Sequence, residues 1–207
     1  MSAAPLEFWF EFASTYSYPA ALRVEAAARS AGVPLAWRPF LLGPIFGAQG
    51  WNDSPFNLYP AKGRYMWRDL ERVCAELGAP FRKPSVFPRN GLLAARVACR
   101  FADEAWCPDF VRAVYRANFA DDREIADAAV VAACLESAGQ PAPARIEAAL
   151  SAESKALLRT QSERAVALGL FGAPTFALRA ELFWGNDRLE AALAWWQKEE
   201  SAQHARG

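Results

Sequence analysis

Histidine is almost missing from this sequence, and its cysteines form no recognisable motif. The single histidine, His204, lies within the last four residues, which nearly excludes a histidine-based metal site or catalytic dyad, and we predict no metal site. The four cysteines, at positions 74, 99, 107 and 134, have no Cys-x-x-Cys spacing. We therefore expect buried, reduced thiols in a cytoplasmic protein.

Net charge and long hydrophobic runs are also lacking. The 23 Lys and Arg residues balance 23 Asp and Glu residues, so the composition gives no support for binding to nucleic acid. No uncharged run is longer than 14 residues, and the run at residues 165–178, which contains glycine and proline, is too short and too interrupted to span a membrane. Glu7 and Glu11 interrupt the apolar stretch near the N-terminus, which has no basic start, and we expect no signal peptide.

Apolar and aromatic residues are abundant instead. The 207 residues include 8 Trp and 14 Phe, and hydrophobic residues make up 53% of the chain. This composition supports a sizeable core in one large domain or two small ones. The aromatic residues predict a thick core, an aromatic pocket, or both.

The start of the sequence predicts a strand, a helix and a second strand. Residues 5–12 alternate acidic and aromatic residues as a strand does, and residues 17–31 follow as a helix that Gly32 ends. Residues 35–40 predict the second strand. So short a crossover implies that the two strands are parallel.

The middle of the sequence predicts helices. Residues 41–61 are rich in Gly, Pro and Asn, and we expect a long, functional loop there. Helical spacing begins at residue 62, and Gly78 ends the first helix. Asp121 and Glu124 resemble a capping box that opens a later helix. The other expected helical segments are residues 92–101, 110–119, a helix closed by Gly139, 142–150 and 154–169.

Near the C-terminus the pattern returns to strands. Residues 175–178 and 181–184 predict two strands around a tight link, and an amphipathic helix follows over residues 186–198. The whole order predicts an α/β protein with a thioredoxin-like fold and an all-helical domain inserted between its halves. The predicted domains are a thioredoxin-like domain, residues 1–45 and 171–207, and a loop plus helical insertion, residues 46–170.

Two turns between predicted elements carry candidate functional residues. Ser14 and Ser17 lie where the first strand passes into the first helix, and free N–H groups and the helix dipole favour an anion there. The same serines are typical helix caps, and the two roles are compatible. Pro174, in Gly-Ala-Pro-Thr directly before the third strand, is alternatively an ordinary edge-strand proline.

Two more segments hold polar candidates. The Gly-Asn-Asp-Arg turn at residues 185–188 passes from a strand into a helix, which is also consistent with a simple N-cap and a surface arginine. Solvent exposure alone would explain the polar residues of the predicted loop. Those candidates are Asn52, Asn57 and Lys62.

Taken in order, these motifs resemble one family. Ser-x-x-Ser stands where a thioredoxin-fold protein has Cys-x-x-Cys, and Gly-x-Pro-Thr stands at the cis-proline turn of that fold. With the helical insertion and the Gly-Asn-Asp-Arg turn, the sequence resembles 2-hydroxychromene-2-carboxylate isomerases from Glu7 to about Lys198. These proteins are related to kappa-class glutathione transferases and, more distantly, to periplasmic DsbA-type oxidoreductases.

The resemblance implies a glutathione site. Ser14 would be the catalytic serine that hydrogen-bonds the glutathione thiolate. Ala173 and Pro174, joined by a cis peptide bond, would offer backbone hydrogen bonds to the tripeptide. The other implied contacts are Asp187 for the γ-glutamyl end, Arg188 in the same turn, Asn52 (or Asn57, with a shifted alignment) and Lys62.

The activity implied is glutathione-dependent cis–trans isomerisation of a small aromatic carboxylate. A kappa-like glutathione transferase acting on another electrophile is the alternative, and a non-catalytic adaptor would bind no glutathione. A dithiol oxidoreductase is not expected, because positions 14 and 17 are serine. The sequence departs from the family pattern at two positions, where Thr15 replaces proline and Pro19 replaces a larger apolar residue. We expect these departures to change the shape of the first turn and, with it, the substrate side of the site. A homodimer is compatible with the sequence.

Overall fold

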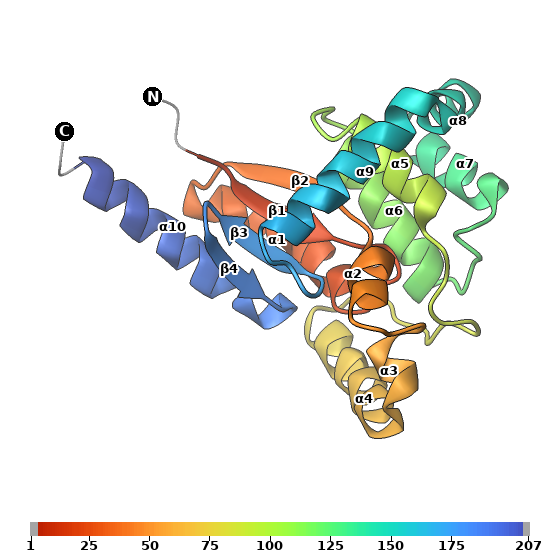
Figure 1. Cartoon of the computed structure of the whole chain (residues 1–207), viewed down its shortest axis with the longest axis horizontal. Coiled ribbons are helices and arrows are strands. Elements are labelled where there is room, and N and C mark those ends of the chain that lie inside the picture. The colour runs from red at the N-terminus through yellow and green to blue at the C-terminus, as the bar shows by residue number, and fades with distance from the viewer. Residues whose placement is uncertain (1–3, 205–207) are drawn as a thin grey trace.

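The computed structural model of the chain describes residues 4–204 and places a four-stranded sheet among them. Strands β1 (Leu6–Phe10) and β2 (Leu35–Pro39) are parallel, as the short crossover predicts. β3 (Thr175–Leu178) pairs antiparallel with β1, and β4 (Glu181–Trp184) pairs antiparallel with β3. The resulting order, β2–β1–β3–β4, shows that the two ends of the chain build one sheet (Figure 1).

Helices cover both faces of this sheet. α1 (Ser17–Ala31) and α10 (Leu189–His204) lie on one face, where α1 also packs against α6 (Cys107–Phe119). α9 (Ala152–Ala167) lies on the other face and contacts β2. The remaining elements are α2 (Leu42–Ala48), α3 (Pro55–Leu58), α4 (Pro60–Glu76), α5 (Leu92–Arg100), α7 (Ala128–Ser137), α8 (Ala142–Leu150) and the 3-10 turn η1 (Asn186–Arg188). In Figure 1, α3 and α4 stand apart from the group formed by α5 to α9.

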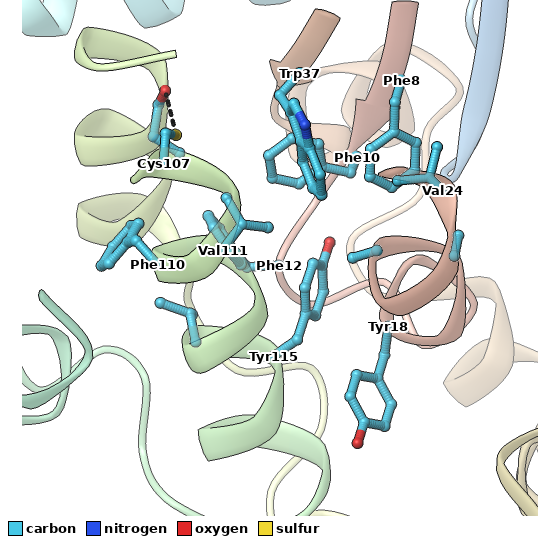
Figure 2. Packing of buried hydrophobic residues seen from close by; sticks show 14 of the residues in the cluster. Phe8, Phe10, Phe12, Tyr18, Val24, Trp37, Cys107, Phe110, Val111 and Tyr115 are labelled. Carbon is cyan, nitrogen blue, oxygen red and sulfur yellow. Dashed lines mark hydrogen bonds between the residues drawn. The ribbon is translucent and has the colours of Figure 1, made fainter. Parts of the chain in front are cut away.

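The alternating residues of β1 contribute to two separate cores, because neighbouring residues in a strand point to opposite faces. Phe8 and Phe10 lie on the face covered by α1 and α6, and both rings pack edge-on against Trp37 (Figure 2). Tyr115 of α6 lies beside Phe10 in the same cluster. Trp9 points to the opposite face, into a smaller cluster formed with α2 and α9. The predicted thick aromatic core is therefore present.

Residues 41–61 do not form the long loop expected from their composition. α2 and α3 are helical, and α4 already begins at Pro60. The prolines fit because Pro44 and Pro55 stand in the first turns of α2 and α3, where the missing N–H group has no helical partner to lose. Ser54 caps α3 by accepting a hydrogen bond from the backbone N–H of Phe56 at 3.3 Å.

The capping box expected at Asp121 and Glu124 is also wrong. α7 begins later, and its N-cap is Asp127, which accepts a backbone N–H at 2.8 Å. Residues 121–127, which precede α7, are not helical, because Asp122 forms an ion pair with the buried guanidinium of Arg89. A contact between distant segments thus overrides a local sequence signal.

Three further expectations concern the whole chain. The four cysteines are free and buried, as predicted. Among residues 4–204, no helix has both the length and the apolar character needed to cross a membrane. The division into a sheet domain and a helical insertion stays a proposal, and α2 spans its first boundary at residues 45 and 46.

Candidate active site

A cavity of about 1380 Å³ lies between the turns at one end of the sheet and helices α2 to α4. Most of the predicted site residues line it: Ser14, Asn52, Lys62, Ala173, Pro174 and Asp187. Arg188 is not among the lining residues; its side chain is 58% exposed, and its guanidinium lies 3.4 Å from the Asp187 carboxylate. The fold therefore brings together residues from both ends of the chain and from the segment predicted to be a loop.

Ser14 lies in the turn between β1 and α1. Its backbone N–H donates to the carbonyl of Glu11 at 3.0 Å, and its hydroxyl donates to the carbonyl of Ala173 at 2.8 Å. Neither predicted serine caps α1, because the N-cap position is Tyr16 and no side chain accepts a hydrogen bond there. Ser17 is fully buried and does not line the cavity. Of the two serines, only Ser14 lines the cavity.

The proline turn leads into the middle of the sheet. The Ala173–Pro174 peptide bond is cis, as the resemblance implies. Because β3 lies between β1 and β4, Pro174 is not an edge-strand proline. Its carbonyl accepts the N–H of Gly185 at 2.9 Å, which joins this turn to the one after β4. Gly172 is required here, since a Cβ atom would lie 2.4 Å from the indole nitrogen of Trp184.

The turn after β4 is held in place by α1. Arg23 Nε donates to Asn186 Oδ1 at 3.0 Å, and the guanidinium also binds the Asn186 carbonyl and the Glu190 carboxylate. Asn186 is therefore a partner of α1 rather than a helix cap. Gly185 has a φ of 118°, and a Cβ atom there would lie 2.5 Å from Asp187 Oδ1. The turn leaves the Asp187 side chain at the edge of the cavity, 72% exposed.

The opposite side of the cavity comes from the segment around α3 and α4. Asn57 donates to both carboxylate oxygens of Asp53 and to the carbonyl of Phe87, each at 3.1 Å, and it does not line the cavity. Asn52 does line it. The exposed side chain of Lys62 lies in the first turn of α4 and lines the same cavity.

The first turn is tied to α4 by two hydrogen bonds. Thr15 stands where the family that the sequence resembles usually has proline. Its hydroxyl donates a hydrogen bond to the sulfur of Met66 at 3.1 Å. The hydroxyl of Tyr16 donates to the carboxylate of Asp69 at 2.9 Å. The departure at position 15 thus contributes a contact that fixes α4, and with it Lys62, relative to Ser14.

Aromatic side chains form walls on both sides of the cavity. On one side they are Phe46, Trp51 and Phe56, from the segment 41–61. Sequence reasoning missed the pair on the other side, Phe171 and Trp184, whose ring centres lie 4.9 Å apart and which are 50% and 53% exposed. The sequence could have indicated them, because Phe171 directly precedes Gly172 and Trp184 directly precedes Gly185, in the two turns that hold predicted site residues.

Glu11 is a second cavity residue that sequence reasoning missed. Its carboxylate accepts the backbone N–H of Ala13 at 3.0 Å. Burial raises the pKa of this carboxyl from 4.5 to about 7, and backbone hydrogen bonds from Ala13 and Ser14 offset only part of that rise. A carboxyl with such a pKa can hold or release a proton near neutral pH. The sequence could have indicated Glu11, because it is an acidic residue directly after the aromatic strand β1.

The cysteines take no part in this site. None of the four lines the cavity. Burial raises the pKa of every one of these thiols, which keeps them protonated and unreactive. The pKa values are about 11 for Cys74, Cys99 and Cys134 and about 12 for Cys107.

Comparison with known proteins places the chain in a family. Residues 5–194 match the family described as DSBA-like thioredoxin domain. The chain is 31% identical over 187 residues to 2-hydroxychromene-2-carboxylate isomerase of Sphingobium xenophagum, an alignment that covers 89% of this chain and 94% of the relative. The chain belongs to the 2-hydroxychromene-2-carboxylate isomerase family. A second isomerase of this name, from Pseudomonas putida, is 30% identical over 89% of this chain and 90% of the relative.

More distant relatives extend the comparison. Glutathione S-transferase kappa 2 of Caenorhabditis elegans is 25% identical over 89% of this chain and 88% of its own length. A solved structure of 2-hydroxychromene-2-carboxylate isomerase has the same fold, with a TM-score of 0.85 over 98% of both chains at 24% identity. The cytosolic disulfide reductase DsbM from Pseudomonas aeruginosa, solved with GSH, has a TM-score of 0.64 at 17% identity over 97% of this chain. The predicted thioredoxin-like fold is confirmed, and this isomerase-family enzyme has an isomerase- or glutathione-transferase-like role.

Proposed function

We propose that this member of the isomerase family is a glutathione-dependent cis–trans isomerase of an aromatic carboxylate, with 2-hydroxychromene-2-carboxylate or a close analogue as substrate. The observation that carries the proposal is the 2.8 Å hydrogen bond from the Ser14 hydroxyl to the Ala173 carbonyl. It brings the serine of the first turn to the backbone of the proline turn, inside one large cavity. The isomerases at 30% and 31% identity support the reaction type.

The lining residues fit the charges of glutathione, which carries one ammonium, two carboxylates and a thiol. Asp187 offers a carboxylate to the ammonium, and Lys62 and Asn52 offer donors to a carboxylate. The Ala173 carbonyl would accept a peptide N–H once the Ser14 hydroxyl turns from it toward sulfur. The Ser14 hydroxyl and the Ala173 carbonyl, which now hydrogen-bond each other, would then both hydrogen-bond the tripeptide.

Ser14 and the N-terminus of α1 would keep the glutathione sulfur ionised. When bound, glutathione supplies a thiolate that adds to a conjugated carbon and leaves again after the bond has rotated. A thiol with a pKa of about 8.5 is only about 3% ionised at pH 7, and lowering that pKa by about two gives about 75%. The change requires about 2.7 kcal/mol. A hydroxyl bonded to a charged acceptor, at about 1.5–3 kcal/mol, and a helix N-terminus, at about 0.3–1 kcal/mol, are together sufficient.

The size and walls of the cavity fit a second, aromatic ligand beside the tripeptide. Ligand pockets usually measure about 300–1,000 Å³, and this cavity, at about 1380 Å³, is larger. Its aromatic walls, Phe46 and Trp51 on one side and Phe171 and Trp184 on the other, suit a flat apolar ring.

A kappa-like glutathione transferase is the second candidate, and the relative from Caenorhabditis elegans favours it. The two are distinguished by assaying the purified protein with glutathione and either 2-hydroxychromene-2-carboxylate or a chloro-nitroarene. Isomerisation without net conjugation supports the isomerase, whereas conjugation without isomerisation supports the transferase. Failure of glutathione to stabilise the protein contradicts both, because saturation at about 100 times Kd should add about 2.7 kcal/mol.

We also propose that the enzyme is cytoplasmic. The four free, buried thiols support this location, since a reducing compartment keeps cysteines in that state. Glutathione, the proposed cofactor, belongs to the same reducing environment. Fractionation of the native host that recovers the protein outside the cytoplasm would contradict this assignment.

A further inference from the structure

Glu11 lies in the same turn as Ser14, and the proposed reaction leaves its carboxyl without a role. Glu11 lines the cavity, and its carboxylate accepts the N–H of Ala13, the residue directly before Ser14, at 3.0 Å. The Glu11 carbonyl is also fixed, because it accepts the N–H of Ser14 at 3.0 Å and the hydroxyl of Tyr115 at 2.9 Å. Contacts on both sides therefore hold this residue beside the proposed sulfur position.

No cation neutralises this carboxylate: among residues 4–204, Glu11 belongs to none of the ion pairs. Tyr115 of α6, whose hydroxyl donates to the Glu11 backbone carbonyl, is a titratable neighbour of this residue, and it stays neutral because burial raises its pKa well above the usual value. A negative charge on Glu11 is thus balanced only by backbone N–H groups. The other charged residues that line the cavity are Asp53, Lys62, Asp69, Arg89 and Asp187.

A sulfur anion held by Ser14 would add a second negative charge to this turn. Two anions in one partly buried site disfavour each other, so a single proton is shared between them. We propose that Glu11 accepts the proton of the glutathione thiol as glutathione binds, an inference that rests on the proposed function. The S–H bond breaks, an O–H bond forms on the Glu11 carboxylate, and the electron pair stays on sulfur. No proton passes to the solvent.

This transfer makes the affinity for glutathione independent of pH between the pKa of Glu11, about 7, and that of the free thiol, about 8.5. In this range the wild-type protein begins with an ionised carboxylate and a protonated thiol, and binding only moves the proton between them. A Glu11→Gln variant has no acceptor. Its affinity should therefore fall about tenfold for each pH unit below about 8.5.

Proton release on binding tests the transfer directly. Wild type and Glu11→Gln are titrated with glutathione at pH 8 in weak buffer with a pH indicator, while the ultraviolet absorbance of the thiolate is recorded. About three-quarters of the free thiol is protonated at this pH. We expect the variant to release about 0.75 proton per glutathione bound, and the wild type close to none, with thiolate absorbance in both. Glu7→Gln, which removes a β1 carboxylate outside the cavity, is the matched control and should behave as wild type.

Each other outcome has a definite meaning. Release of about 0.75 proton by the wild type overturns the inference while leaving the proposed function intact, and this result needs no variant to fold. Binding without thiolate absorbance also overturns it, because the thiol then keeps its proton. Absence of glutathione binding to the wild type contradicts the proposed function itself, and the inference with it.

Discussion

Replacing Glu11 by Gln is expected to stabilise the protein at alkaline pH, although the residue lines the candidate active site. Burial raises the pKa of this carboxyl from 4.5 to about 7, so the folded chain binds the proton more tightly than the unfolded chain. The stability linked to that proton is complete below pH 4.5 and is lost as pH rises to 7. Gln has no proton to lose, and its amide oxygen can still accept the N–H of Ala13.

The size of the effect follows from the two pKa values. The difference between 4.5 and about 7 corresponds to a gain of about 3 kcal/mol for Glu11→Gln at pH 8. At pH 5, close to the unfolded-state pKa, the same change should gain less than about 1 kcal/mol. Glu7→Gln is the control of opposite sign, because the Glu7 carboxylate binds Arg38 at 3.1 Å and Arg164 at 2.7 Å. Its removal should destabilise the protein.

Urea unfolding of the wild type and both variants at pH 5 and pH 8 provides the measurement. The free energy of unfolding of Glu11→Gln should exceed that of the wild type at pH 8 and approach it at pH 5. An equal difference at both pH values, or a loss of stability at pH 8, would refute the argument that burial of an unpaired carboxylate controls this site.

Three other changes test the site. Ser14→Ala should fold and lose about a hundredfold or more in kcat. Ser17→Ala should lose less kcat, because Ser17 is buried away from the cavity. A wild-type kcat for Ser14→Ala would mean that Ser14 has a structural role only. Asp187→Asn should raise the KM for glutathione more than it lowers kcat, and Arg188→Gln, outside the cavity, should change neither; equal effects would contradict the proposed contact. Replacing all four cysteines should preserve glutathione-dependent turnover in whatever protein folds, and turnover lost while glutathione still binds would indicate a protein thiol as nucleophile.

The residues that could be predicted from the sequence are those whose position depends on chain direction. Ser14 follows the first strand, Pro174 precedes the third, and Asp187 follows the fourth. The ends of neighbouring strands bring their turn residues to the same edge of a sheet, whatever packs around them. The order of the motifs along the chain was therefore sufficient to predict that these three residues lie close together. The fold itself followed from the same alternation of strands and helices, with the aromatic strand β1 at its centre.

The features of the site that could not be predicted from the sequence depend on contacts between distant segments. Asn52 lines the cavity and Asn57 does not, because the Asn57 amide is engaged by Asp53 and Phe87. Arg188 follows Asp187 directly, yet the 3-10 turn leaves it outside the cavity. The ionisation of Glu11 is set by the protein that buries it, which no local pattern encodes.

In the proposed mechanism, the sulfur of glutathione acts as a nucleophile and is returned unchanged. Isomerisation of 2-hydroxychromene-2-carboxylate should therefore be measured with glutathione, with S-methylglutathione and with neither, at a large excess of substrate over cofactor. We expect many turnovers per glutathione with the thiol recovered intact, no turnover without glutathione, and inhibition rather than support by S-methylglutathione. Full activity without glutathione, or with its S-methyl derivative, would contradict this mechanism.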